Sequence, residues 1–160
     1  MTRVLALIIL AATTLIGCAP IERQARFIES EYTPYLGRGT SSIIGQAFLR
    51  TRGGDVKTAA GLPVVLTPVT SYSAEWFTQE VLMHRRLSEP DYRAEKYNRA
   101  AIADAEGRFK FNFLSAGRYY LTCEIYWAIS EDEWTGDTAY AVVELGPDDT
   151  VEAVVTRPPD

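Results

Sequence analysis

Two stretches in the second half of the chain alternate apolar and polar side chains, and this alternation constrains the fold most. In the stretch 108–113, phenylalanines occupy every second position and polar side chains lie between them. A second stretch, 118–127, places an apolar residue at every second position from Tyr119 to Trp127. Because side chains on a strand point alternately to its two faces, a period of two indicates half-buried antiparallel strands. We therefore expect a mainly β fold.

Further strands are expected on both sides of these two. The predicted strands lie at 43–51, 62–69, 108–113, 118–127, 138–145 and 150–156. Pro63 and Pro68 confine the second of them to a sheet edge or to strand ends. The interval 70–103 fits no strand pattern, and we expect it to be a helical insertion. Its first helix would start near an N-cap at Ser73, and a shorter one would span 91–98.

Three short motifs occur in order along the predicted strands. Gly61-Leu62-Pro63-Val64-Val65-Leu66 opens a strand with glycine, Asp104-Ala105-Glu106-Gly107-Arg108-Phe109 forms a tight turn, and Gly117-Arg118-Tyr119-Tyr120-Leu121 follows. Together they resemble the carboxypeptidase regulatory-like family. The resemblance implies an antiparallel Greek-key β-sandwich of the prealbumin type, with about seven strands. It also implies a non-catalytic module and carries over no catalytic or binding residue.

The N-terminus has the parts of an export signal. Met1-Thr2-Arg3 precedes an apolar run, Val4 to Ile16, that is shorter than the ~20 residues a transmembrane helix needs. The sequence Leu15-Ile16-Gly17-Cys18 resembles the lipobox of bacterial lipoproteins. This resemblance implies that residues 1–17 are removed and that Cys18 carries lipid. Ala19, in place of the aspartate that retains lipoproteins in the inner membrane, favours an outer-membrane protein facing the periplasm. An ordinary secretory signal is the alternative.

Residues 18–42 are expected to connect this anchor to a domain at 43–157. The apolar residues Ile21, Ala25, Ile28 and Tyr32 recur at helical spacing, which predicts a short amphipathic helix before Pro34. The Gly- and Ser-rich stretch 37–42 is typical of a flexible joint. We expect this segment to be a spacer, and the alternative is a helix that lies on the domain or on a partner.

Composition limits the domain count and the class of partner. Without a 17-residue signal, the 160 residues become 143, which suits one domain. Loss of Arg3 changes the formal net charge from −5 to −6, so nucleic acid is not an expected partner. Cys123 falls on the apolar face of its strand and is expected to be buried and inert. A Cys18–Cys123 disulfide would require a Cys18 without lipid.

The residues give no support to catalysis. His84 is the only histidine of the sequence, and no Gly-x-Ser-x-Gly motif is present. We therefore expect a protein that is not an enzyme and has no cofactor. The acidic stretch 131–137 could collect Ca²⁺, but it lacks the order of an EF-hand loop. We expect a solvated hairpin loop there and predict no metal site.

The insertion is the best candidate contact surface. Between His84 and Arg99 it has a net charge of +2 and contains interleaved aromatic residues. Trp76, Tyr92, Arg93 and Tyr97 are the candidate ligand or partner contacts. Alternatively, the helix only covers a sheet edge or face, with its aromatic side chains buried.

Our main hypothesis is a lipid-anchored envelope protein whose β-sandwich binds or scaffolds another envelope protein. The competing hypothesis is a lipoprotein that binds glycan, cell wall or a small ligand through the aromatic residues of the insertion. The oligomeric state stays open.

Overall fold

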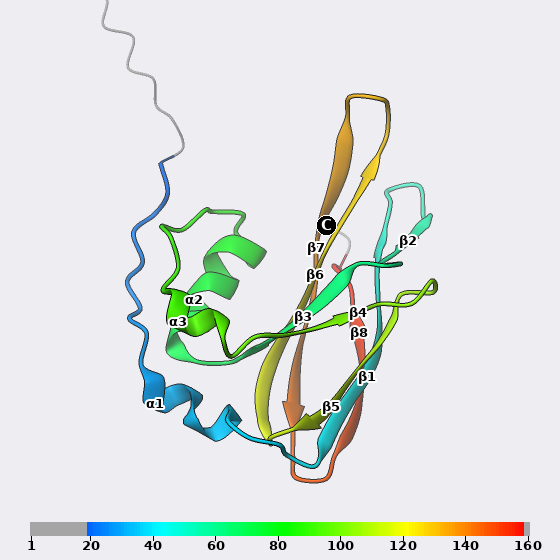
Figure 1. Cartoon of the computed structure of the whole chain (residues 1–160). Coiled ribbons are helices and arrows are strands. Elements are labelled where there is room, and N and C mark those ends of the chain that lie inside the picture. Colours follow the sequence, from blue (N-terminus) through cyan, green and yellow to red (C-terminus); the bar gives the residue numbers. More distant parts are fainter. Residues whose placement is uncertain (1–18, 159–160) are drawn as a thin grey trace, which may run out of the picture.

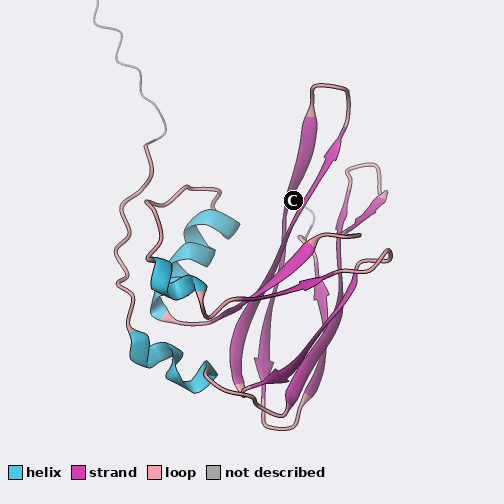
Figure 2. Ribbon diagram, in the orientation of Figure 1, coloured by secondary structure: helices cyan, strands magenta, loops and turns pink. Residues whose placement is uncertain are grey.

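The computed structural model describes residues 19–158, and they form a mainly β structure with a few short helices (Figures 1 and 2). The strands are β1 (Ser41–Arg50), β2 (Val56–Thr58), β3 (Pro63–Pro68), β4 (Arg99–Ile102), β5 (Arg108–Leu114), β6 (Gly117–Ala128), β7 (Trp134–Leu145) and β8 (Thr150–Val155). They form two sheets, and the predicted β-sandwich class is confirmed. The predicted signal peptide and Cys18 lie outside the described residues. Within residues 19–158, no helix is both long enough and apolar enough to span a bilayer.

The first sheet is organised around β1. This strand pairs antiparallel with β5, with Ile43 opposite Phe111, and parallel with β8, with Ile43 opposite Val151. The short strand β2 pairs with the last residues of β1. The parallel β1–β8 pair departs from the purely antiparallel arrangement that we expected. It joins segments at opposite ends of the described chain.

The second sheet has the strand order β4-β3-β6-β7, and its pairs are all antiparallel. The pairing of β3 with β6 ends at Val65 opposite Thr122. Strands β6 and β7 continue together to Ala128 opposite Trp134. The two strands therefore project from the sandwich as a long hairpin (Figure 1).

Between the sheets lies a single apolar core. Apolar side chains that alternate along the strands supply it, and Leu121, Val64 and Val155 have almost no exposed surface. Cys123 belongs to the same core as a free thiol. Burial raises the pKa of this thiol from 9.0 to about 11, and the neighbouring Glu124 adds to the shift.

One residue of the predicted core lies outside it. We expected Phe113 to share a face with Phe109 and Phe111. Instead Phe113 has a φ of 58°, its side chain is 55% exposed, and the next residue, Leu114, is buried. The β1–β5 register shifts at the same point, near Ser41. The extra residue of this irregularity reverses the alternation, and the Arg38 guanidinium covers the Phe113 ring at 4.1 Å.

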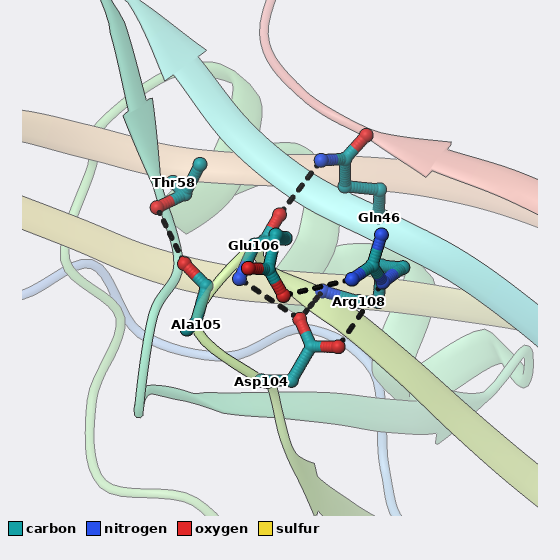
Figure 3. A network of polar contacts seen from close by, with 6 residues as sticks. All are labelled: Gln46, Thr58, Asp104, Ala105, Glu106 and Arg108. Atoms are coloured by element: carbon teal, nitrogen blue, oxygen red, sulfur yellow. Dashed lines mark hydrogen bonds and ion pairs between the residues drawn. The ribbon is translucent and has the colours of Figure 1, made fainter.

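The turn between β4 and β5 is built around Asp104, whose polar contacts are drawn in Figure 3. The Asp104 carboxylate accepts hydrogen bonds from the amides of Glu106 and Arg108, at 3.0 and 2.7 Å. The Gln46 side chain donates to the Glu106 carbonyl at 2.7 Å. Gly107 has a φ of +79°, where a side chain is strained. The turn between β4 and β5 is therefore also hydrogen-bonded to β1, through Gln46.

The N-terminal segment differs from the expected spacer. Residues 21–28 are extended rather than helical, and helical turns occur only in α1 (Glu29–Tyr32) and η1 (Thr33–Tyr35). Arg23, Ala25 and Phe27 are partly buried, while the residues between them are exposed. This alternation lays the segment along the insertion as a strap, which we define as residues 20–28. The strap is visible as the blue trace beside the green helices in Figure 1.

The insertion contains helices, as predicted, but also a strand that we missed. It comprises α2 (Ser71–Trp76), the π-helix η2 (Phe77–Leu82) and α3 (Tyr92–Glu95). The N-cap of α2 is Thr70 instead of Ser73, because the Thr70 hydroxyl accepts from the Ser73 amide at 3.1 Å. Residues 99–102 of the expected insertion form β4.

Candidate functional site

An aromatic cluster fixes the insertion to the outer face of the second sheet. The ring of Phe77 stacks on that of Tyr120 with centroids 4.0 Å apart, and Tyr140 meets Phe77 edge-on at 5.4 Å. Phe77, Val81 and Tyr120 are buried and form an apolar cluster separate from the sandwich core. Such pairs contribute beyond the area that they bury. The insertion is therefore a packed layer of the molecule.

Beside this cluster lies a cleft with a volume of about 1110 Å³. Its floor is the outer face of β3, β6 and β7, and includes Thr122, Glu124 and Tyr126. Its opposite wall is formed by the insertion, with Tyr72 and Trp76, and by the strap. Aromatic rings and hydrogen-bonding groups thus line one concave surface. This combination is usual for small-molecule sites.

Arg23 joins the strap to the cleft wall. Its side chain is only 10% exposed, and its Nε donates to the Ser88 carbonyl at 2.9 Å. The guanidinium lies over the Tyr72 ring at 5.0 Å, and its Nη2 is 3.9 Å from a carboxylate oxygen of Glu80. Within the described residues, Nη1 of Arg23 has no hydrogen-bond partner. The cleft wall therefore contains a buried cation with unused donor capacity.

The π-helix ends at the rim of the cleft. The Met83 amide donates to the Thr78 carbonyl at 3.1 Å, and His84 follows with a φ of 52°. His84 Nε2 lies 2.9 Å from a guanidinium nitrogen of Arg157 and 3.7 Å from Asp137. Arg157 in turn pairs with Asp137 of β7 at 3.0 Å. These contacts connect the end of η2 to the projecting hairpin, and π-helical turns are frequent at functional sites.

The structure does not bring the four predicted contact residues into one site. Only Trp76 lines the cleft. Tyr92 is 79% exposed and does not belong to the cleft lining. Tyr97 is buried, because its ring stacks on Tyr32 at 4.4 Å and its hydroxyl bonds to Glu29 at 3.3 Å.

Arg93 and Lys96 are paired with carboxylates, so neither is an unpaired cation available to a ligand. Arg93 forms a bidentate pair with Asp91, at 2.9 and 2.6 Å, and this pairing lowers the pKa of Asp91 to about 2. The Arg93 guanidinium also stacks over Phe27 of the strap at 4.7 Å. Lys96 pairs with Glu29 at 3.2 Å.

The floor residues Thr122, Glu124 and Tyr126 were missed from the sequence. Their alternation with Cys123 and Ile125 was visible, but a polar strand face usually faces solvent. Only the insertion that lies over this face makes it part of a cleft. Arg23 was missed because the strap was expected to be a helix.

The chemistry of the cleft is suited to holding a ligand. The His84 ring bonds to Arg157 and lies near Asp137. Within residues 19–158, no group of three or more potential metal ligands occurs. Flat rings with hydroxyl and carboxylate neighbours can stack on a ligand and hydrogen-bond to its edges.

Comparison with known proteins gives a likeness to a solved structure. No protein-family model matches the chain, and no curated protein matches it in sequence. Its fold is similar to that of a proposed carbohydrate-binding protein from Pseudomonas aeruginosa, with a TM-score of 0.73 and 26% identity. The match covers 83% of this chain and 99% of that one.

Two enzyme structures overlap the chain more weakly. (S)-allantoin synthase has a TM-score of 0.33 at 12% identity, and the match covers 75% of this chain and 42% of that one. Chlorocatechol 1,2-dioxygenase from Pseudomonas putida has a TM-score of 0.26 at 10% identity, with 90% and 69% covered. These overlaps are too low to support an argument.

The chain is thus a β-sandwich similar to a structure whose proposed role is binding. The lipobox and carboxypeptidase regulatory-like resemblances stay predictions.

Proposed function

We propose that this protein is a lipid-anchored, non-catalytic carbohydrate-binding protein of the bacterial cell envelope. Cys18 carries the anchor, the protein faces the periplasm from the outer membrane, and the ligand occupies the cleft beneath the insertion. The observation that supports the binding role best is the cleft itself, because it combines Trp76 and Tyr126 with the hydrogen-bonding groups of Thr122 and Glu124. The likeness to a proposed carbohydrate-binding protein, which spans nearly all of that chain, supports the same conclusion.

Glycan binding can be tested by retention on isolated cell wall and on a panel of insoluble polysaccharides, with affinities from titration calorimetry. We expect Trp76→Ala and Tyr126→Ala each to weaken binding about fivefold or more, since loss of one stacking ring typically costs about 1 kcal/mol. Tyr92→Ala is the matched control, because it removes an exposed aromatic ring outside the cleft. Equal retention of all variants, or no retention of the wild type, would contradict the proposal.

The anchor is tested separately in cells. Cys18→Ala should move the protein from the membrane fraction to the soluble fraction. A wild-type protein that is already soluble would contradict the lipid anchor.

The projecting hairpin favours a second function, the binding of another envelope protein. Ile129 and Trp134 lie near its end and are 55% and 66% exposed. Large exposed apolar side chains are enriched at protein interfaces. A photo-crosslinker at position 134 should capture one defined envelope protein in intact cells. The same crosslinker at Tyr92 is the control, and identical products from both positions would count against this function.

A further inference from the structure

We propose that the insertion side of the domain lies on the headgroup layer of the bilayer, with the segment Leu82–Arg86 in contact with lipid. This inference rests on the proposed lipid at Cys18, and it names a protein surface that the anchor alone does not specify. It follows from how the strap is attached, from the reach of the chain and from the side chains near the attachment.

The strap is fixed to the insertion immediately after the anchor position. The Ile21 amide donates to the Arg86 carbonyl, and the Ser88 amide donates to the Ile21 carbonyl, both at 2.8 Å. Two residues farther on, the Arg23 amide donates to the Ser88 hydroxyl at 3.2 Å. The Glu75 carboxylate then accepts from the amides of Gln24 and Ala25, at 2.7 and 2.9 Å. The chain therefore has little freedom to swing the domain away from the point where it enters the insertion.

The remaining reach is short. A fully extended chain spans at most about 3.3–3.6 Å per residue, so the three residue steps from Cys18 to Ile21 cover no more than roughly 10–11 Å. A lipid chain at Cys18 is embedded in the hydrocarbon, which places the Cys18 backbone at the headgroup layer. Ile21 must then lie close to that layer. The segment Leu82–Arg86 must lie there too, because Arg86 is hydrogen-bonded to Ile21.

The side chains beside the attachment suit such a surface. Ile21, Leu82 and Met83 are 38%, 40% and 53% exposed, although all three are apolar. Arg85 and Arg86 are exposed, and neither forms an ion pair within the described residues. Apolar side chains that enter the interface, together with cations that meet phosphates, are the features of interfacial segments. Arg85 and Arg86 are adjacent in a chain that is acidic as a whole, so this segment carries two neighbouring positive charges.

The test uses the full lipidated protein on vesicles of phosphatidylethanolamine and phosphatidylglycerol that contain brominated lipid as a quencher. A fluorophore is placed on an introduced cysteine, either Met83→Cys or the control Lys110→Cys. Lys110 is exposed on β5, in the sheet that does not carry the insertion. Cys123 is buried and stays unlabelled in the folded protein.

We expect lipid quenching at position 83 to be at least threefold stronger than at position 110. Equal quenching at both positions in vesicle-bound protein would overturn the contact surface and leave the anchor intact. Protein that does not sediment with the vesicles would overturn the anchor and this surface together.

Charge reversal by Arg85→Glu with Arg86→Glu provides a second test on the same vesicles. It should reduce quenching at position 83 by half or more while the protein still sediments. Unchanged quenching would contradict the role of these arginines at the membrane. Glycan retention is measured in a separate experiment without vesicles. Failure of the proposed glycan binding is therefore distinguishable from failure of the proposed membrane contact.

Discussion

At the scale of single residues, a strand buries every second side chain only where its register with the neighbouring strand is constant. From Tyr119 to Ile125 every second side chain is buried as expected, and Cys123 is among them. The prediction was wrong at Phe113, because a register shift reverses the alternation there. A shift of this kind depends on how β1 and β5 meet. It therefore leaves no trace in the pattern of one strand.

Gly107 gives a residue-scale prediction with an internal control. A Cβ at Gly107 would lie 2.5 Å from the Ala47 carbonyl oxygen, in addition to the strain of its positive φ. Gly54 also has a positive φ, of +94°, but a Cβ there would meet nothing within 4 Å. We expect Gly107→Ala to lower the free energy of unfolding by about 2–4 kcal/mol and Gly54→Ala by only about 1 kcal/mol. Urea denaturation measures both, and equal losses would contradict the clash.

The thiol of Cys123 gives a prediction about pH. Its pKa is about 11 in the folded protein against 9.0 for an unperturbed thiol, because burial disfavours the thiolate. The unfolded chain thus loses this proton first as pH rises. The contribution of the buried, protonated Cys123 thiol to the free energy of unfolding is therefore complete below pH 9 and is lost between pH 9 and 11. Urea denaturation at pH 8 and pH 10.5 should show a smaller loss of stability in Cys123→Ala than in the wild type. The comparison with Cys123→Ala is needed because burial also raises the pKa of Tyr119, to about 12, so Tyr119 also contributes to the loss of stability at high pH.

At the scale of elements, long regular segments were predictable and short or extended ones were not. Strands β5, β6 and β8 lie close to their predicted positions, since each has several alternating residues. Strand β7 begins at Trp134 instead of 138, so residues 134–137 of the expected acidic loop belong to the strand. Strands β2 and β4 have three and four residues, too few to establish a period. The strap was predicted as a helix because four apolar residues matched helical spacing. In the structure its partner is the insertion, and the side chains that pack are Arg23, Ala25 and Phe27.

The attachment of the strap can be checked at Glu75. Its carboxylate accepts two amide hydrogen bonds from the strap, so Glu75→Ala removes both acceptors. We expect the amides of residues 24 and 25 to exchange hydrogen at least tenfold faster in this variant, while the amides of β6 stay protected. Glu95→Ala, at an exposed position in α3, is the control. Fast exchange at residues 24 and 25 in the wild type would show that the strap is not attached.

At the scale of the whole molecule, the buried apolar side chains form two separate clusters, and each stabilises a different part of the domain. The larger lies between the sheets, and the smaller holds the insertion on the second sheet. The sequence predicted the first cluster, but it could not predict the cleft, because the cleft exists only where the insertion lies over the outer face of β6. The polar side chains Thr122 and Glu124 carry no sign of this arrangement on their own.

The two clusters should respond differently to truncation. Leu121→Ala creates a cavity in the sandwich core and should lower the free energy of unfolding of the whole domain by about 3–5 kcal/mol. Phe77→Ala removes the ring that stacks on Tyr120, so the insertion should lose protection from hydrogen exchange while the sheets retain it. Ligand binding in the cleft should be lost with it. Hydrogen exchange measured by mass spectrometry on both variants distinguishes loss of the whole domain from loss of the insertion. Loss of protection in every strand of Phe77→Ala would contradict the separation of the two clusters.

The parallel pairing of β1 with β8 has a consequence for how the molecule is made. Ser42 lies opposite Thr150, so β1 pairs with a strand, β8, that is synthesised about a hundred residues later. Because the chain is synthesised from its amino end, β1 must stay without its β8 partner until the final strand has been made. Contacts between such distant segments slow folding and prolong the exposure of unpaired edges. We therefore expect completion of the first sheet to be a late step in folding.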